Sequence, residues 1–473
     1  MKKLSIVLLI FISLILVSCQ QEEIKMYKVT FTDINGNIIE TVSVEEGKSV
    51  TPPSAPDVRF YTFNGWSEEL SNITKDVTIQ AQYVLSSEAK DMTHYNYWLH
   101  ILSNKYDIDA PLMTEEEINE YNKLIVKGKM YTNVVDVLSM DKTISSYDVL
   151  SMISSYSKIS RYTVYNENSN STLSSSERDI ILNNRNLDNI PTTVDIKFGL
   201  ITDFAWMRAY PTNAYANSYS RDQFQETSLN VGEVVVVLHE SLDNKWYFVQ
   251  ATNYYGWVEK QYIALCSYED AYNFSNPNDN LVVISDYVNI ENSHVRMGQS
   301  FPLISNDENY NILFPTRNSD GNLILKNITL NKTDDYSVGY LTYNYTNVFK
   351  QGFKLLGIDY SWGDKEKDGR DCSSTQNSIY ACFGFKLPRN TGNQNDIPKY
   401  GESFSSITVN QVINNYLPGT LIFSSGHVMM YIGCNNEGIA YILHNTSAGD
   451  AKCILQSLSD YGINKIKGSL KLQ

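Results

Sequence analysis

The sequence lacks several patterns that often identify a protein. Its six cysteines are scattered over 473 residues, with no Cys-x-x-Cys pair and no disulfide framework. No glycine-rich loop of the Walker or dinucleotide-binding type is present, and no histidines stand at metal-ligand spacing, so we expect no cofactor and no metal. Basic residues are fewer than acidic ones, 38 against 53, which argues against a nucleic-acid partner.

A long apolar run occurs only near the N-terminus, over residues 4–17, after two lysines. It is short for a membrane span and typical of a signal peptide. The Leu-Val-Ser-Cys sequence that ends at Cys19 resembles a bacterial lipobox, which implies that residues 1–18 are removed and that Cys19 carries lipid. An ordinary signal peptide cut near Ser18 is the alternative. We therefore expect a cell-surface protein anchored by lipid to the outer face of the bacterial cytoplasmic membrane, or to its periplasmic side in a diderm.

The most informative feature that is present is Cys372, which follows an aspartate at the start of a predicted helix. Ile379, Cys382 and Phe383 form one apolar face at helical spacing, and Gly384 ends the helix. A cysteine at a helix N-terminus feels the positive end of the macrodipole, which favours the thiolate. We therefore expect a nucleophile that is ionised near neutral pH.

Two histidines follow in a segment with the alternation of β-strands. His427 begins an expected strand over residues 427–433, and His444 ends the next one, over residues 437–444. Adjacent antiparallel strands can place two such side chains side by side on one face. The pattern predicts a catalytic triad in which the cysteine attacks a carbonyl, His427 takes and returns the proton, and His444 orients His427.

At these residues the chain resembles the NlpC/P60 cysteine peptidases, which have a papain-like α+β fold. The resemblance covers residues 346–473, and no single motif would carry it. The motifs occur in the family's order: Tyr-x-Trp-Gly at 360–363, Asp-Cys-Ser at 371–373, Leu-Pro-Arg at 387–389, Gly-His-Val at 426–428 and the polar residue His444.

Residues 196–270 and 278–345 resemble the bacterial SH3-like domains that precede this peptidase in one branch of the family. Enzymes of that branch are γ-D-glutamyl-L-diamino-acid endopeptidases. The resemblance implies that this chain hydrolyses the bond between D-glutamate and the third residue of peptidoglycan stem peptides through a cysteine thioester. The partners would be stem peptides or muropeptides.

The same branch holds the free amine of the substrate's N-terminal L-alanine. The resemblance places these contacts at Asp371 and Ser373 beside the nucleophile and at Asn390 and Thr391 after Leu-Pro-Arg. An aromatic residue of the first SH3-like domain closes the pocket, and Tyr210 is the candidate. Some members have an aspartate in place of Asn390, and a neutral amide holds an ammonium less strongly than a carboxylate does.

The N-terminal half adds two further parts. After a tether over residues 19–26, residues 27–84 resemble one Listeria–Bacteroides surface repeat, a β-grasp-like module. Residues 89–195 form a helical and loop-rich stabilising segment, in which Thr114 and Glu117 predict a capping box. The expected fold class is multidomain α+β: a small β-grasp-like repeat, a helical segment, two SH3-like β-barrels and a papain-like C-terminal domain.

Other functions remain open from the sequence. A thioester acyltransferase would use the same residues, with an amine in place of water. A surface-binding lipoprotein with an inactive peptidase domain is the second alternative. The sequence leaves open whether the diamino acid is diaminopimelate or lysine, whether intact wall or released fragments are cut, and whether Cys434 and Cys453 form a disulfide.

Overall fold

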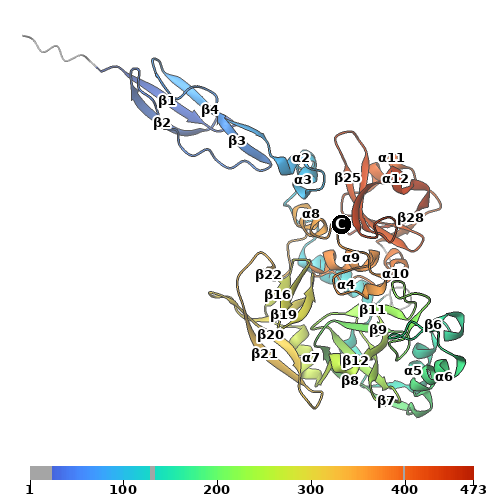
Figure 1. The fold of residues 1–473 in the computed structure, drawn as a ribbon. Helices are drawn as coiled ribbons and strands as arrows, with labels where there is room; N and C mark the ends of the chain where they lie inside the picture. Colours follow the sequence, from blue (N-terminus) through green and yellow to red (C-terminus); the bar gives the residue numbers. More distant parts are fainter. Residues whose placement is uncertain (1–23, 128–133, 398–399, 473) are drawn as a thin grey trace, which may run out of the picture. The chain divides into compact units, whose positions relative to one another are not determined.

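The computed structural model describes residues 24–127, 134–397 and 400–472 (Figure 1). The chain divides into two compact units, one ending at Met92 and the other beginning at Thr93. Within the described ranges, no helix has the length and apolar character needed to cross a membrane. The predicted signal peptide and lipidation site, Cys19, lie outside the described residues.

The smaller unit is a four-stranded sheet in the order β2-β1-β4-β3. β1 pairs antiparallel with β2 and parallel with β4, and Val29, Phe31 and Ile79 are fully buried beneath the sheet. The short helix α2 (Ser87–Lys90) follows it. The strands are β1 (Met26–Thr32), β2 (Ile38–Glu45), β3 (Tyr61–Trp66) and β4 (Val77–Leu85).

The larger unit begins with a helical segment. The predicted capping box is confirmed, because Thr114 N–H donates to Glu117 (2.8 Å) and Glu117 N–H donates to the Thr114 hydroxyl (3.3 Å). Short strands β5 (Thr143–Ser145) and β7 (Thr193–Asp195) pair with each other, and β6 (Val164–Tyr165) pairs with β10 (Tyr215–Ala216). The helices are α3 (Tyr95–Ser103), α4 (Glu115–Lys127), α5 (Ser146–Ser154) and α6 (Ser175–Asn184).

A seven-stranded sheet follows, in the order β11-β9-β14-β13-β12-β8-β15, and is called here the first β-domain. Phe248 and Trp257 lie fully buried in its core, as alternating residues on β13 and β14 allow. Its strands are β8 (Lys197–Ile201), β9 (Ala205–Arg208), β11 (Gln225–Leu229), β12 (Val234–Glu240), β13 (Trp246–Gln250), β14 (Tyr255–Glu259) and β15 (Ile263–Cys266).

The second β-domain follows α7 (Tyr268–Ser275) and has a five-stranded sheet in the order β21-β20-β19-β16-β22. Its buried Phe301 and Phe314 belong to the same hydrophobic core as Trp257, so the two β-domains pack as one body. The strands are β16 (Asn280–Val283), β19 (Ser300–Ser305), β20 (Tyr310–Arg317), β21 (Leu323–Leu330) and β22 (Tyr336–Val338), with a separate hairpin of β17 (Tyr287–Ile290) and β18 (Ser293–Arg296).

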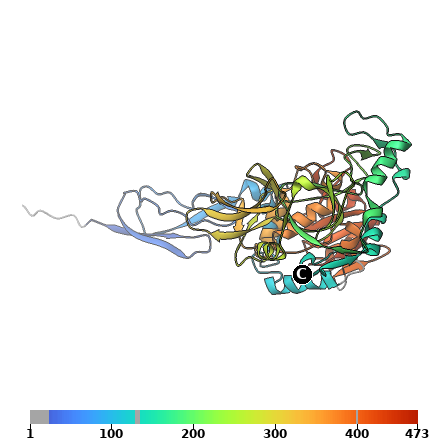
Figure 2. The same cartoon turned by 90° about the horizontal axis from the view of Figure 1, so that it is seen from below.

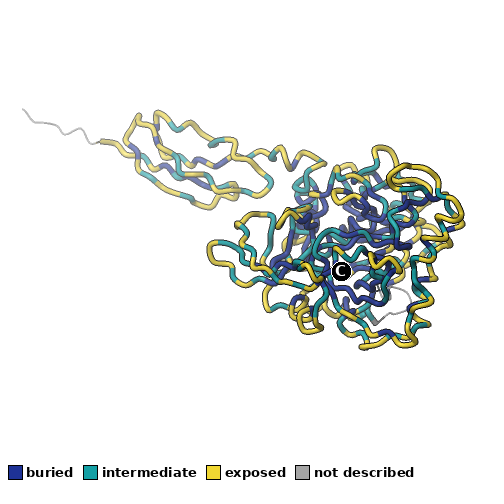
Figure 3. The backbone as a smooth tube through the Cα atoms, turned by 60° about the horizontal axis from the view of Figure 1, so that its bottom comes forward, coloured by how far each residue is buried: buried dark blue, intermediate teal, exposed yellow. Residues whose placement is uncertain are grey.

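The C-terminal domain is a six-stranded antiparallel sheet in the order β23-β28-β24-β25-β26-β27, with α9 packed on β25 and β26. In two views it lies beside the first β-domain (Figures 1 and 2). Its interior is almost wholly buried (Figure 3). The elements are α8 (Tyr345–Lys354), η5 (Trp362–Asp364), α9 (Cys372–Ala381), α10 (Thr391–Asn395), β23 (Gly401–Ser403), α11 (Val409–Asn415), β24 (Leu421–Ser424), β25 (His427–Cys434), β26 (Ala440–Asn445), β27 (Cys453–Ser457), α12 (Leu458–Tyr461) and β28 (Ile466–Leu470).

The predicted nucleophile helix is confirmed as α9. It begins at Cys372 and buries Ile379, Cys382 and Phe383 on one face, and the chain turns away at Gly384, whose φ of 86° suits glycine. Periodicity therefore located both the helix and the face that it buries.

Candidate active site

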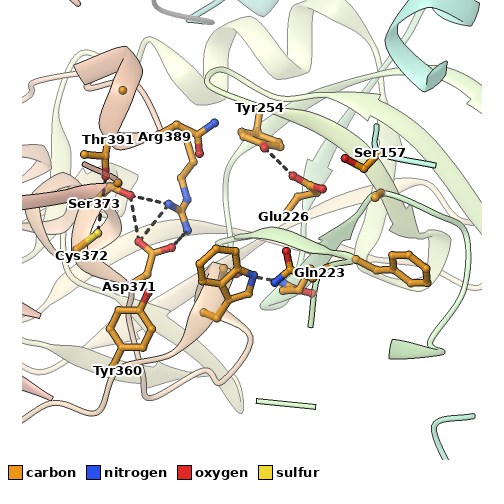
Figure 4. Close-up of a pocket in the computed structure, with 18 of the residues that line it drawn as sticks. Ser157, Gln223, Glu226, Tyr254, Tyr360, Asp371, Cys372, Ser373, Arg389 and Thr391 are labelled. Carbon is orange, nitrogen blue, oxygen red and sulfur yellow. Dashed lines mark hydrogen bonds and ion pairs between the residues drawn. The ribbon is translucent and has the colours of Figure 1, made fainter. Parts of the chain in front are cut away.

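Cys372, the first residue of α9, borders a pocket of about 380 Å³ (Figure 4). Asp371 caps the helix by accepting a hydrogen bond from Ser374 N–H (3.0 Å). The first-turn N–H groups of a helix lack intrahelical acceptors and carry partial positive charge. They can therefore stabilise negative charge that develops beside the Cys372 sulfur.

The pocket has two walls that come from distant parts of the sequence. Cys372 and its neighbours form one wall, and the first β-domain with Ser157 and Tyr162 forms the other (Figure 4). Arg389 lies near the centre of the first wall, and Glu226 and Tyr254 lie in the second. The remaining lining residues are Ala209, Tyr210, Gln223, Phe224, Gln225, Tyr360, Trp362, Gly363, Asp371, Ser373, Asn390, Thr391, Gly392 and Gly426.

The two predicted histidines lie on adjacent strands, as the alternation predicted. Nε2 of His427 is 2.7 Å from Nδ1 of His444. The N–H of Val428, the next residue along β25, hydrogen-bonds the Cys372 thiol, so the sulfur lies against the start of that strand. Because Nε2 of His427 is engaged by His444, Nδ1 is the nitrogen left to exchange a proton with sulfur.

The protonation states differ from the sequence prediction. Burial, with the charge of Asp371 added, raises the pKa of the Cys372 thiol to about 11. Burial, together with His444, lowers the pKa of His427 to about 3, and burial lowers the pKa of His444 to about 4. The prediction of a thiolate near neutral pH is therefore wrong for the free protein, in which a neutral thiol faces neutral imidazoles.

Alkylation tests this protonation state without any substrate. Since iodoacetamide reacts with the thiolate, labelling of Cys372 is expected to be slow at pH 7 and to rise about tenfold per pH unit up to about pH 10. The measurement is the labelling rate at Cys372 by peptide mass spectrometry, with buried Cys382 as an internal control. Fast, pH-independent labelling near pH 7 would instead show the ionised thiol.

The predicted amine-binding residues Asp371 and Ser373 are engaged within the protein. Arg389 pairs with Asp371 through two hydrogen bonds (2.6 and 3.1 Å), and its Nη1 also donates to the Ser373 hydroxyl (2.9 Å). Burial alone would raise the pKa of Asp371, but the guanidinium holds it below its usual range. The Asp371 charge is therefore neutralised by Arg389.

The other three predicted binding residues all line the pocket. The Thr391 hydroxyl lies 3.7 Å from the Cys372 sulfur. Asn390 is the N-cap residue of α10 and hydrogen-bonds Tyr254. Tyr210 turns its hydroxyl away to donate to the carbonyl of Ser157 (2.9 Å), so only its ring is available to a ligand.

Sequence reasoning missed Glu226, the carboxylate of the first β-domain that faces this pocket. Its Oε2 accepts from the Tyr254 hydroxyl (2.6 Å), and burial raises its pKa. Among the described residues it forms no ion pair. The only available signal was an acidic residue inside an expected SH3-like strand, which is compatible with an exposed position as well.

Contacts from both β-domains hold the loop that precedes α9. The ammonium of Lys365 lies 3.4 Å from the ring centroid of Tyr219 and 3.5 Å from Asp222. Arg296 of the second β-domain donates to the carbonyls of Glu366 (2.8 Å) and Gly369 (2.7 Å). The wall that carries Glu226 is thereby fixed opposite Cys372.

The cysteines of the described residues are free thiols, so Cys434 and Cys453 do not form a disulfide. Cys434 pairs with Ala440 at one end of β26, and Cys453 pairs with Asn445 at the other end. No group of three His, Cys, Asp or Glu side chains in the described part of the chain could hold a metal ion.

Comparison with known proteins identifies three parts of the chain. Residues 357–463 match the NlpC/P60 family, residues 211–259 match an SH3 domain of the SH3b1 type, and residues 27–93 match the Listeria-Bacteroides repeat domain. No curated protein matches the chain.

Two solved structures are similar. One, described as a novel NlpC/P60 endopeptidase from Photobacterium damselae subsp. piscicida, is 18% identical with a TM-score of 0.62, covering 79% of this chain and 96% of its own. Another, an NlpC/P60 family protein from Bacillus cereus, is 21% identical with a TM-score of 0.41, covering 52% of this chain and 82% of its own.

The domains and the site together define a hydrolase of the cell-wall peptidase class. Through residues 357–463 the chain belongs to the NlpC/P60 family. The predicted family and the multidomain α+β fold class with SH3-like domains are confirmed. The NlpC/P60 and SH3 domains indicate an extracellular protein that acts on the cell wall.

Proposed function

We propose that this protein is a cysteine endopeptidase that hydrolyses the γ-D-glutamyl–diamino acid bond of peptidoglycan stem peptides with a free N-terminal L-alanine. The observation that carries the proposal is the pocket itself, in which Cys372 faces the unpaired carboxylate of Glu226 across about 380 Å³. This volume is in the range of small-ligand pockets, about 300–1,000 Å³. It suits a short peptide better than a polymer strand, which favours released fragments as substrates.

The free amine of the substrate would pair with Glu226 rather than with Asp371. A carboxylate in a poorly solvated pocket gains most from a charged partner. Glu226 has only the neutral Tyr254 as a hydrogen-bond donor, whereas Asp371 already holds Arg389. The predicted roles of Ser373, Asn390, Thr391 and the Tyr210 ring then reduce to shaping the pocket around the dipeptide.

The reaction follows from the positions of three groups. Nδ1 of His427 accepts the thiol proton as the Cys372 sulfur attacks the γ-carbonyl carbon of D-glutamate, and first-turn N–H groups of α9 stabilise the oxyanion. The imidazolium then protonates the leaving amine of the diamino acid, and a thioester remains. His427 next takes a proton from water, which attacks the thioester and releases the acid and the thiol. His444 holds the His427 ring throughout.

Two assays with the purified chain test this function. L-Ala-γ-D-Glu-diaminopimelate should be cleaved to the dipeptide and the free diamino acid, and its N-acetyl derivative should be cleaved at least about tenfold more slowly. Product analysis by mass spectrometry separates hydrolysis from acyl transfer to an amine, and the lysine peptide and intact sacculi show which wall material is cut. Equal cleavage of free and N-acetylated peptides would contradict the amine site.

We further propose that Cys19 carries lipid and anchors the chain outside the cytoplasmic membrane. The lipobox-like sequence and the cell-wall-acting domains support this. Because the chain is acidic overall, acyl chains rather than a basic patch would supply the membrane affinity. The Listeria–Bacteroides repeat would then act mainly as a spacer between the anchor and the enzyme.

A further inference from the structure

A third polar side chain continues the pair of imidazoles. Oε1 of Gln456 lies 3.1 Å from Nε2 of His444, whose Nδ1 lies 2.7 Å from Nε2 of His427. The three residues come from the adjacent strands β27, β26 and β25. They form one line of hydrogen bonds that ends at the ring facing Cys372.

The direction of the protons along this line is set at its outer end. A neutral imidazole has one N–H donor and one acceptor nitrogen, and an amide oxygen can only accept. His444 must therefore donate from Nε2 to Gln456, which leaves its Nδ1 as an acceptor. His427 must then donate from Nε2, which leaves its own Nδ1 without a proton.

The opposite orientation of the amide would reverse every step. If the Gln456 NH₂ group faced His444, Nε2 of His444 would accept, Nδ1 would donate, and Nδ1 of His427 would carry a hydrogen. A protonated Nδ1 cannot take the thiol proton of Cys372. The orientation of one amide thus decides whether His427 can act as a base.

The rings have little freedom to escape this constraint. His444 is 1% exposed, so an unpaired ring nitrogen there would cost the desolvation of a polar group, about 1–3 kcal/mol. The ring of Tyr461 stacks on His427 at 6.0 Å between centroids and meets His444 edge-on at 5.6 Å. Packing therefore fixes both ring planes, and the hydrogen bonds fix the tautomers.

We propose that Gln456 is a positioning residue that sets the tautomers of His444 and His427, so that Nδ1 of His427 is unprotonated and accepts the thiol proton of Cys372. The consequence for turnover rests on the proposed function. The tautomers themselves do not, because they can be measured on the protein without substrate.

Two substitutions separate this role from a structural one. Gln456→Glu keeps an acceptor oxygen, so the Nδ1 of His427 should stay unprotonated and kcat should change by no more than a few-fold. Its negative charge should raise the pKa of both imidazoles, which moves the acidic limb of the kcat profile to higher pH. Gln456→Met has a similar shape without a good acceptor, and we expect kcat to fall about 10- to 100-fold with little change in KM. Leu455→Met, one residue away on β27, is the matched control and should behave as the unmodified chain.

The direct readout is ¹⁵N NMR of the histidine-labelled full chain, with the His427 and His444 signals assigned from single substitutions. Nδ1 of His427 should show the shift of an unprotonated nitrogen in the unmodified chain and in Gln456→Glu, and should lose it in Gln456→Met. A protonated Nδ1 in the unmodified chain overturns the proposal, even if Gln456→Met does not fold. An unchanged tautomer and kcat in Gln456→Met also overturns it. The predicted NMR pattern in a chain that cleaves no stem peptide would leave this inference standing and remove the proposed function instead.

Discussion

Replacement of Cys372 by alanine is expected to lower kcat on a free-amine stem peptide by about 10⁴- to 10⁶-fold, because the proposed reaction has no other nucleophile. The fold should survive, since the substitution removes a single sulfur atom beside a pocket rather than a core side chain. The measurements are single-turnover cleavage followed by mass spectrometry, and thermal unfolding of the same sample. With thiol present, a thioester should be trapped early in the reaction, and no such adduct should form with Cys372→Ala.

Cys382→Ala is the matched control for this experiment. Cys382 lies ten positions further along the same helical face but is wholly buried and outside the pocket. Its substitution should lower the free energy of unfolding more than Cys372→Ala does, by about 1 kcal/mol, while turnover is kept. Retained turnover in Cys372→Ala would contradict the nucleophile and favour the role of an inactive binding lipoprotein.

The local geometry of the site could be predicted from the sequence because it depends on short-range rules. Helical spacing placed Cys372 at the start of α9, and strand alternation placed His427 and His444 on one face of β25 and β26. Each of these placements depends on a few neighbouring residues, so one sequence without relatives was sufficient.

The protonation state of Cys372 could not be predicted by the same rules. The helix macrodipole contributes about 0.3–1 kcal/mol, which is less than one pKa unit. Burial of a thiol can raise its pKa by several units, and it is the larger effect here. Burial depends on what packs over the helix start, and the covering wall comes from the first β-domain.

The amine partner was misplaced for a related reason. The sequence puts Asp371 beside the nucleophile, but only the folded chain brings Arg389 onto it. The guanidinium also reaches the Thr227 hydroxyl (2.6 Å), which ties the two walls of the pocket together. A contact across so many residues leaves no periodic signal, so neither the Asp371–Arg389 pair nor the free carboxylate of Glu226 could be inferred.

Replacement of Glu226 by glutamine is expected to lower kcat/KM for the free-amine stem peptide by about 30- to 1,000-fold. The reason is that the ammonium loses its only charged partner in a poorly solvated pocket, while the amide keeps the size of the side chain. The N-acetylated peptide carries no ammonium, so its slow cleavage should change by less than about threefold. The quantity to measure is the ratio of kcat/KM for the two peptides, which falls only if Glu226 recognises the amine.

Glu233→Gln supplies the matched control, because Glu233 belongs to the same β-domain and burial raises its pKa as well. It accepts hydrogen bonds from the backbone N–H and the side-chain amide of Asn230 (both 2.9 Å) and does not line the pocket beside Cys372. Loss of its charge should leave the ratio for the two peptides unchanged. If Glu226→Gln slowed both peptides equally, the carboxylate would support the structure of the pocket rather than bind the amine. If Asp371→Asn alone changed the ratio, the amine would belong beside the nucleophile, and Arg389 would have to release Asp371 when substrate binds.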